Sequence, residues 1–114
     1  MVAIKFNNDS FVSGGDDKII RIFTFALDEE KKKKKIKLIS KLEGHDGEIY
    51  CLLELLDGRV ASGSADWTVK IWDIKNKCCL QTLVGRKSSI LFLAQFNDGK
   101  LISGSEDKSI YIWD

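Results

Sequence analysis

Short apolar runs alternate with polar turns along the whole chain, and their lengths predict strands. The runs lie at residues 2–6, 11–13, 19–25 and 36–42, then 48–55, 60–64, 68–73 and 78–83, and finally 90–96, 100–104 and 109–113. They are rich in β-branched and aromatic side chains, which favour strands. No segment repeats its apolar positions at the helical period, and no proline interrupts a strand. The sequence therefore predicts an all-β chain.

One motif occurs three times. Residues 62–73 read SGSADWTVKIWD, residues 103–114 read SGSEDKSIYIWD, and residues 13–23 read SGGDDKIIRIF. Gly44-His45 lies ahead of the middle copy, and a period of about 40 to 45 residues with Gly-His and Trp-Asp is typical of a propeller blade of four antiparallel strands. The chain resembles the WD-repeat β-propeller family over nearly its whole length. The resemblance implies antiparallel four-stranded blades.

The repeats divide the chain into a first blade at residues 1–43, a second at 44–84 and a third at 85–114 that lacks its outer strand. Closed propellers have about four to eight blades, and an open stack leaves apolar end faces in water. With about 2.75 blades, we expect part of a larger or oligomeric ring. The chain is then a piece of a longer protein, a unit completed by further copies of itself, or a unit packed against another chain.

A lysine-rich insertion at residues 28–37 makes the first repeat longer than the second. It holds six lysines and three acids, so the rest of the chain carries a net charge of −2 although the total is +1. Because consecutive lysines repel one another, we expect a solvated loop. One interpretation is a surface insertion whose acids weaken its field. The other is an anion-binding loop for lipid, RNA or an import receptor, formed by Lys31, Lys32, Lys33, Lys34, Lys35 and Lys37.

The remaining composition indicates an intracellular protein. Three cysteines without regular pairing favour a reducing compartment, and residues 1–6 have neither the pattern of a signal peptide nor that of a membrane span. We expect a cytoplasmic or nuclear location and no transmembrane segment. The nearly neutral repeat body argues against general nucleic-acid binding, which requires a broad basic surface.

A buried hydrogen-bonded relay is implied by the family resemblance. In that family a His, a Ser or Thr of the second strand, the Asp of the following turn and the Trp of the third strand are linked, and the matching residues here are His45, Ser62, Asp66 and Trp72. In the third repeat Arg86 replaces the His, with the same number of residues between it and Asp107. Arg86 and Asp107 could form an ion pair in place of the relay. The first repeat has Phe23 in place of the Trp. Only the second repeat matches the complete relay.

Two chemical interpretations of these residues compete with the structural one. His45 as a general base near Cys51 or Ser62 would give a nucleophilic dyad, but the repeat itself explains the His-Ser-Asp set. Cys51, Cys78 and Cys79 lack the paired spacing of a zinc site. We therefore expect no catalytic residue, no metal and no cofactor.

The partner-binding positions are also implied by the resemblance. Family members usually bind partners on the face that carries the loops before the inner strand and after the second strand. The matching residues are Asp16, Glu48, Tyr50, Ala65, Ser89, Leu91 and Glu106. Apolar Tyr50 and Leu91 beside acidic neighbours suggest an anchor for a basic peptide or protein segment; the alternative is that both side chains simply cover the blade edge.

The sequence thus predicts a non-catalytic scaffold for protein–protein interaction. Its partners are other proteins or peptides, and further blades from a longer chain or from other copies. Two alternatives remain: a structural unit that completes a ring by self-assembly, and a module that binds anionic lipid or RNA through the lysine-rich insertion.

Overall fold

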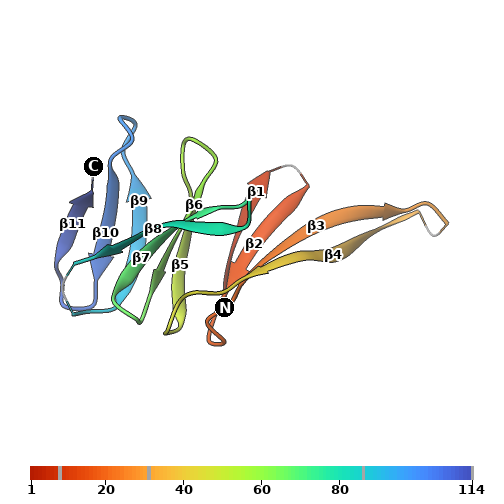
Figure 1. Ribbon diagram of the computed structural model, residues 1–114. Coiled ribbons are helices and arrows are strands. Elements are labelled where there is room, and N and C mark those ends of the chain that lie inside the picture. Colours follow the sequence, from red (N-terminus) through yellow and green to blue (C-terminus); the bar gives the residue numbers. More distant parts are fainter. Residues whose placement is uncertain (8, 31, 86, 114) are drawn as a thin grey trace.

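The computed structural model describes residues 1–7, 9–30, 32–85 and 87–113 as three antiparallel sheets side by side (Figure 1). The first sheet contains β1 (Val2–Asn7), β2 (Ser10–Gly14), β3 (Ile20–Asp28) and β4 (Lys33–Leu42). The second contains β5 (Ile49–Glu54), β6 (Val60–Ser64), β7 (Thr68–Asp73) and β8 (Cys78–Val84), and the third contains β9 (Ile90–Gln95), β10 (Leu101–Ser105) and β11 (Ile110–Trp113). The predicted all-β fold of propeller blades is confirmed.

Each sheet is a meander in which strands pair in sequence order. Tight turns join the first two strands of the second and third sheets, where Gly58 and Gly99 have φ of 89° and 94°. This positive φ is the reason the sequence has glycine after aspartate at both turns. In the described chain the third sheet ends at β11, so it has three strands and an unpaired edge.

Two apolar cores lie between the sheets. Val12 and Ile20 of the first sheet pack with Val60 and Trp72 of the second in one core. In the other core, Val69, Ile71 and their neighbours on the second sheet pack with Ile90 and Leu101 of the third. Because a fully buried side chain of this size contributes about 1.5–3 kcal/mol, contact between sheets is a major source of stability.

The Ser-Gly pairs of the repeats allow this close approach. A Cβ on Gly63 would lie 2.5 Å from Cys51 Sγ and 2.6 Å from Ile90 Cγ2, an atom of the next sheet. A Cβ on Gly14 would likewise lie 2.8 Å from Ile49 Cγ2. Glycine at this position therefore lets the inner strand of each following sheet pack against β2 or β6.

The outer face of the third sheet is apolar and exposed, and that of the first sheet carries half-buried aromatic rings. Val69 and Ile71, which bury against the third sheet, correspond by repeat position to Ile110 and Ile112, which are 67% and 60% exposed. On the first sheet Phe11 stacks on Phe23, with ring centroids 4.9 Å apart. We call these two surfaces the end faces. They are the surfaces that an incomplete propeller leaves open.

The lysines at 32–35 and 37 of the lysine-rich insertion are exposed to solvent, as expected, but most of the insertion is a β-hairpin, so the expectation of a loop was wrong. β3 and β4 pair as far as Asp28 and Lys33, and this ribbon reaches well beyond the rest of the first sheet (Figure 1). Lys31 lies outside the described residues. We call residues 24–37 the lysine hairpin.

The pairing register explains why lysines are tolerated in the lysine hairpin. Opposite residues share a face of an antiparallel ribbon, and Phe25 pairs with Ile36 while Ala26 pairs with Lys35 and Thr24 with Lys37. Side chains alternate between faces along each strand. The lysines at 33, 35 and 37 therefore share one face, whereas Lys34, which pairs with Leu27, shares the other with Phe25 and Ile36. Water reaches every lysine in the run from Lys32 onward.

Candidate interaction face

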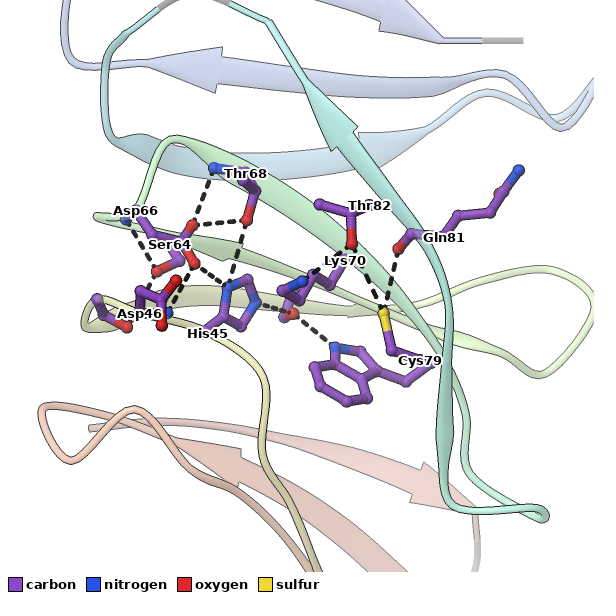
Figure 2. A network of polar contacts seen from close by, with 12 residues as sticks. His45, Asp46, Ser64, Asp66, Thr68, Lys70, Cys79, Gln81 and Thr82 are labelled. Carbon is purple, nitrogen blue, oxygen red and sulfur yellow. Dashed lines mark hydrogen bonds and ion pairs between the residues drawn. The ribbon is translucent and has the colours of Figure 1, made fainter.

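The relay residues are joined in one buried network (Figure 2). His45 Nδ1 lies 2.7 Å from Asp66 Oδ2 and His45 Nε2 lies 2.6 Å from Ser62 Oγ. The Trp72 indole N–H donates to the same Ser62 oxygen at 2.7 Å. Because a carboxylate only accepts, Nδ1–H donates to Asp66, and the Ser62 hydroxyl donates to Nε2. Every polar atom of the neutral relay thus has a partner.

Burial controls the protonation of this network. Burial lowers the pKa of His45 below its usual 6.5, while Asp66 raises it to a lesser extent. Burial alone would raise the pKa of Asp66, yet hydrogen bonds from Thr68, His45 and the Asp46 amide hold it below 3.8. Asp66 also closes its turn, accepting from the Thr68 amide at 2.9 Å and hydroxyl at 2.6 Å. The relay holds the loop before β5 to the β6–β7 turn.

The same contacts argue against a nucleophilic dyad. Ser62 is fully buried, and its oxygen already accepts from Trp72. Burial raises the pKa of the Cys51 thiol to about 12, so the thiolate required for attack is scarce at neutral pH. Cys51 Sγ points to the Ile90 carbonyl oxygen, 3.9 Å away, rather than to His45.

The other repeats hold their turns differently. In the third, Trp113 donates to Ser103 Oγ at 3.0 Å and the Asp107 amide donates to Ser88 Oγ at 3.0 Å. Arg86, the expected partner of Asp107, lies outside the described residues. In the first, Asp17 accepts from Arg21 and from the Ile19 amide near the surface.

Five of the predicted binding positions lie in the loops before β5 and β9 and in the turns after β2, β6 and β10, and these segments together we call the loop face. Tyr50 and Leu91 follow as the second residues of β5 and β9. Backbone hydrogen bonds fix these segments to each other. The Ala65 amide donates to Glu48 O at 2.8 Å, and the Glu106 amide donates to Ser89 O at 2.9 Å. Across sheets, the Ile49 amide donates to Gly15 O at 3.1 Å, beside Asp16.

Tyr50 occupies an acidic part of the loop face. Its side chain is 37% exposed, and the charge of Glu48 raises the pKa of its hydroxyl, with smaller contributions from Glu106 and Asp16. The three carboxylates come from three sheets, so only the assembled stack brings them to one ring. Leu91 is exposed on β9.

Trp67 is a loop-face residue that the sequence analysis missed. It is 44% exposed and lines a shallow groove together with residues from the loop before β9 and from the β10–β11 turn: Lys87, Ser88, Ser89, Glu106 and Asp107. One signal was present in the sequence. At this position of the aligned repeats the other two units have Lys18 and Lys108, so the aromatic residue is specific to the second.

In the part of the chain that the structure describes, no group of three or more His, Cys, Asp or Glu side chains is placed to share a metal ion. Nor does that part contain a helix with the length and apolar character needed to cross a bilayer.

Comparison with known proteins identifies the family. Residues 36–73 and 77–114 match the family model described as WD domain, G-beta repeat. These two stretches cover more than half of the chain, which therefore belongs to the WD-repeat family, as the sequence motifs indicated. Propellers of this family generally serve as protein-interaction scaffolds.

Individual relatives share one or two repeats with the chain. It is 35% identical over 85 residues to Cell division control protein 4 of Saccharomyces cerevisiae, covering 75% of this chain and 10% of that protein. It is 46% identical over 44 residues to F-box/WD repeat-containing protein 7 of Drosophila melanogaster, covering 39% and 3%. The chain thus spans a tenth or less of the length of these relatives.

A solved structure confirms the fold. The WD40 β-propeller domain of Doa1 aligns with 99% of this chain and 36% of its own, with a TM-score of 0.84 and 24% sequence identity.

Proposed function

We propose that this chain is a non-catalytic scaffold that binds a basic peptide or protein segment on the loop face around Tyr50. The observation that carries the proposal is the meeting of an exposed aromatic ring with three carboxylates: Glu48, Glu106 and Asp16 all act on the Tyr50 hydroxyl. An aromatic anchor with polar surroundings is the arrangement that carries most binding energy in protein interfaces.

The rigidity of the loop face supports this function. Backbone hydrogen bonds and the buried relay hold the loops before partner binding, so little conformational entropy is lost on association. Tyrosine itself loses little entropy because it has two side-chain torsions. The acids select a cationic partner and speed its approach more than they add affinity.

The experiment compares two peptides of equal length, one of alternating arginine and glycine and one of alternating glutamate and glycine, each labelled with fluorescein. We expect the chain to bind the arginine peptide, and Tyr50→Ala to remove most of that binding while the unfolding midpoint stays unchanged. Leu56→Ala is the control, because Leu56 is also an exposed apolar side chain but lies on the β5–β6 turn, at the other end of β5 from Tyr50. Equal binding of both peptides, or an effect of Leu56→Ala as large as that of Tyr50→Ala, would contradict the proposal.

A second candidate function is self-assembly through the end faces. Ile110 and Ile112 occupy the repeat positions that Val69 and Ile71 fill in the core between the second and third sheets, so another blade fits there. Self-assembly would give a mass in solution that is a fixed multiple of the 12.9 kDa of one chain. A monomer with cooperative unfolding would exclude it.

The lysine hairpin supports a third candidate, binding to anionic lipid or RNA. Its lysines at 33, 35 and 37 share one face and lie about 7 Å apart along the strand. Binding to phosphatidylserine vesicles or to single-stranded RNA should then weaken steeply with salt and be lost on replacing these three lysines by glutamine. Binding that survives this replacement would exclude the hairpin as the site.

A further inference from the structure

Trp67 is placed where the backbone does not favour it. Its φ is 76°, in the left-handed region, and its amide donates to Ser64 O at 3.3 Å to close the β6–β7 turn. The equivalent Lys18 and Lys108 both have φ of 70° and close their turns in the same way. The turn therefore imposes this conformation on whichever residue is present, and glycine or asparagine would satisfy it best.

The Trp67 side chain contributes nothing visible to the fold. It belongs to neither apolar core, and nearly half of it faces solvent. Because the turn imposes the same conformation on the lysines of the other two repeats, the feature specific to the second repeat is a partly exposed indole ring at this position. Tryptophan is also among the residues most enriched at binding hot spots.

The groove that Trp67 lines carries two carboxylates and one lysine. Glu106 and Asp107 lie on its β10–β11 side, and Lys87 with two serines lies on the side of the loop before β9. Glu106 therefore lines the same groove as Trp67, and its charge also contributes to the raised pKa of Tyr50. An indole face beside carboxylates attracts a cation through the ring quadrupole and through charge at once.

We propose that this groove binds the side chain of a lysine or arginine in a protein partner, stacked on the Trp67 ring and paired with Glu106. The inference rests on the proposed function and adds a second anchor to it. One cationic side chain occupies the Tyr50 site and another occupies the Trp67 groove.

The charge of Lys87 predicts the direction in which a substitution should change peptide affinity. Its ammonium lines the same groove and repels a bound cation, so Lys87→Gln should strengthen binding of the arginine peptide. Glu106→Gln should weaken it. If the partner were acidic, Lys87→Gln would weaken binding and Glu106→Gln would strengthen it.

The decisive variant is Trp67→Asn, tested in the full chain with the arginine–glycine peptide. Asparagine tolerates the left-handed conformation, so we expect an unfolding midpoint equal to or above that of the unaltered chain. Loss of the cation–π contact and of the ring surface should weaken binding about fivefold or more. Lys18→Asn makes the same change in the equivalent turn of the first repeat and should leave affinity at or above its original value.

NMR can test whether the peptide binds at the Trp67 groove. The indole N–H resonance of Trp67, assigned by its disappearance in Trp67→Asn, should shift as the peptide is added, whereas that of buried Trp72 should not. Unchanged affinity in Trp67→Asn together with an unmoved indole resonance would overturn the proposal. If Tyr50→Ala still abolishes peptide binding in that case, the proposed function holds and only the groove is excluded. If neither Tyr50→Ala nor Trp67→Asn reduces peptide binding, the proposed function and the groove are both excluded.

Discussion

The hydrogen bonds of Asp66 predict that this carboxylate stabilises the fold far more than its equivalent in the first repeat. Asp66 accepts from His45 Nδ1–H, from the Thr68 amide and hydroxyl, and from the Asp46 amide at 3.0 Å. Its side chain is only 10% exposed and that of His45 is fully buried. Asp66→Ala therefore leaves a buried imidazole N–H without an acceptor.

The expected loss of unfolding free energy follows from this unsatisfied imidazole N–H. An unsatisfied buried polar group costs about 1–3 kcal/mol, and loss of the turn contacts adds to it, so we expect a total of about 3 kcal/mol. Asp17 has fewer partners near the surface, Arg21 and the Ile19 amide, and Asp17→Ala should produce a clearly smaller loss. Urea unfolding with matched m-values measures both. Equal midpoint shifts for the two variants would refute the reasoning.

A double-mutant cycle separates the relay from the turn. His45→Phe removes the imidazole while Thr68 keeps its bonds to Asp66, so Asp66→Ala should cost less in the His45→Phe background. We expect a coupling energy of about 1 kcal/mol or more between the two sites. Additive effects would show that Asp66 acts only through its turn.

Two more outcomes are expected from the same geometry. Since the folded pKa of His45 lies below 6.5, the unfolded chain binds more protons as pH falls through 6.5, and stability should decline there. The depressed pKa of Asp66 adds a second decline below 3.8. In urea titrations across pH, His45→Phe should abolish the first decline and reduce the second, because His45 is one of the hydrogen-bond donors that lower the pKa of Asp66. Gly63→Ala should cost about 1–3 kcal/mol, because its Cβ would meet Cys51 and Ile90. Gly58→Ala, with nothing within 4 Å of its Cβ but a φ of +89°, should cost less, and a larger loss for Gly58→Ala would contradict the packing argument.

The strands and the repeat could be predicted from the sequence because both depend on local signals. Residues 60–64 and 68–73 were placed with the bounds that β6 and β7 have, since glycine turns and β-branched runs mark them on either side. The relay positions follow from the repeat register. The hydrogen-bond geometry does not, because the positions of the Asp46 amide and the Thr68 hydroxyl around Asp66 depend on how the two loops meet.

The lysine hairpin and the Trp67 groove could not be predicted from local sequence patterns. Repulsion among lysines suggested a loop, yet pairing with the apolar residues of β3 and alternation between faces accommodate the charges in a strand. Trp67 looked like one more turn residue. Its importance appears only when the third sheet brings Glu106 and Lys87 beside it, a contact between residues about 20 to 40 positions apart.

The central claim is that a cationic segment binds the loop face, and amide chemical shifts during titration with the arginine–glycine peptide test it most directly. The account predicts that the resonances that move belong to Asp16, Glu48, Tyr50, Ala65, Trp67 and Glu106, while those of the lysine hairpin and of the end faces stay in place. Shifts confined to the lysine hairpin or the end faces, or no shifts at all at saturating peptide, would contradict it.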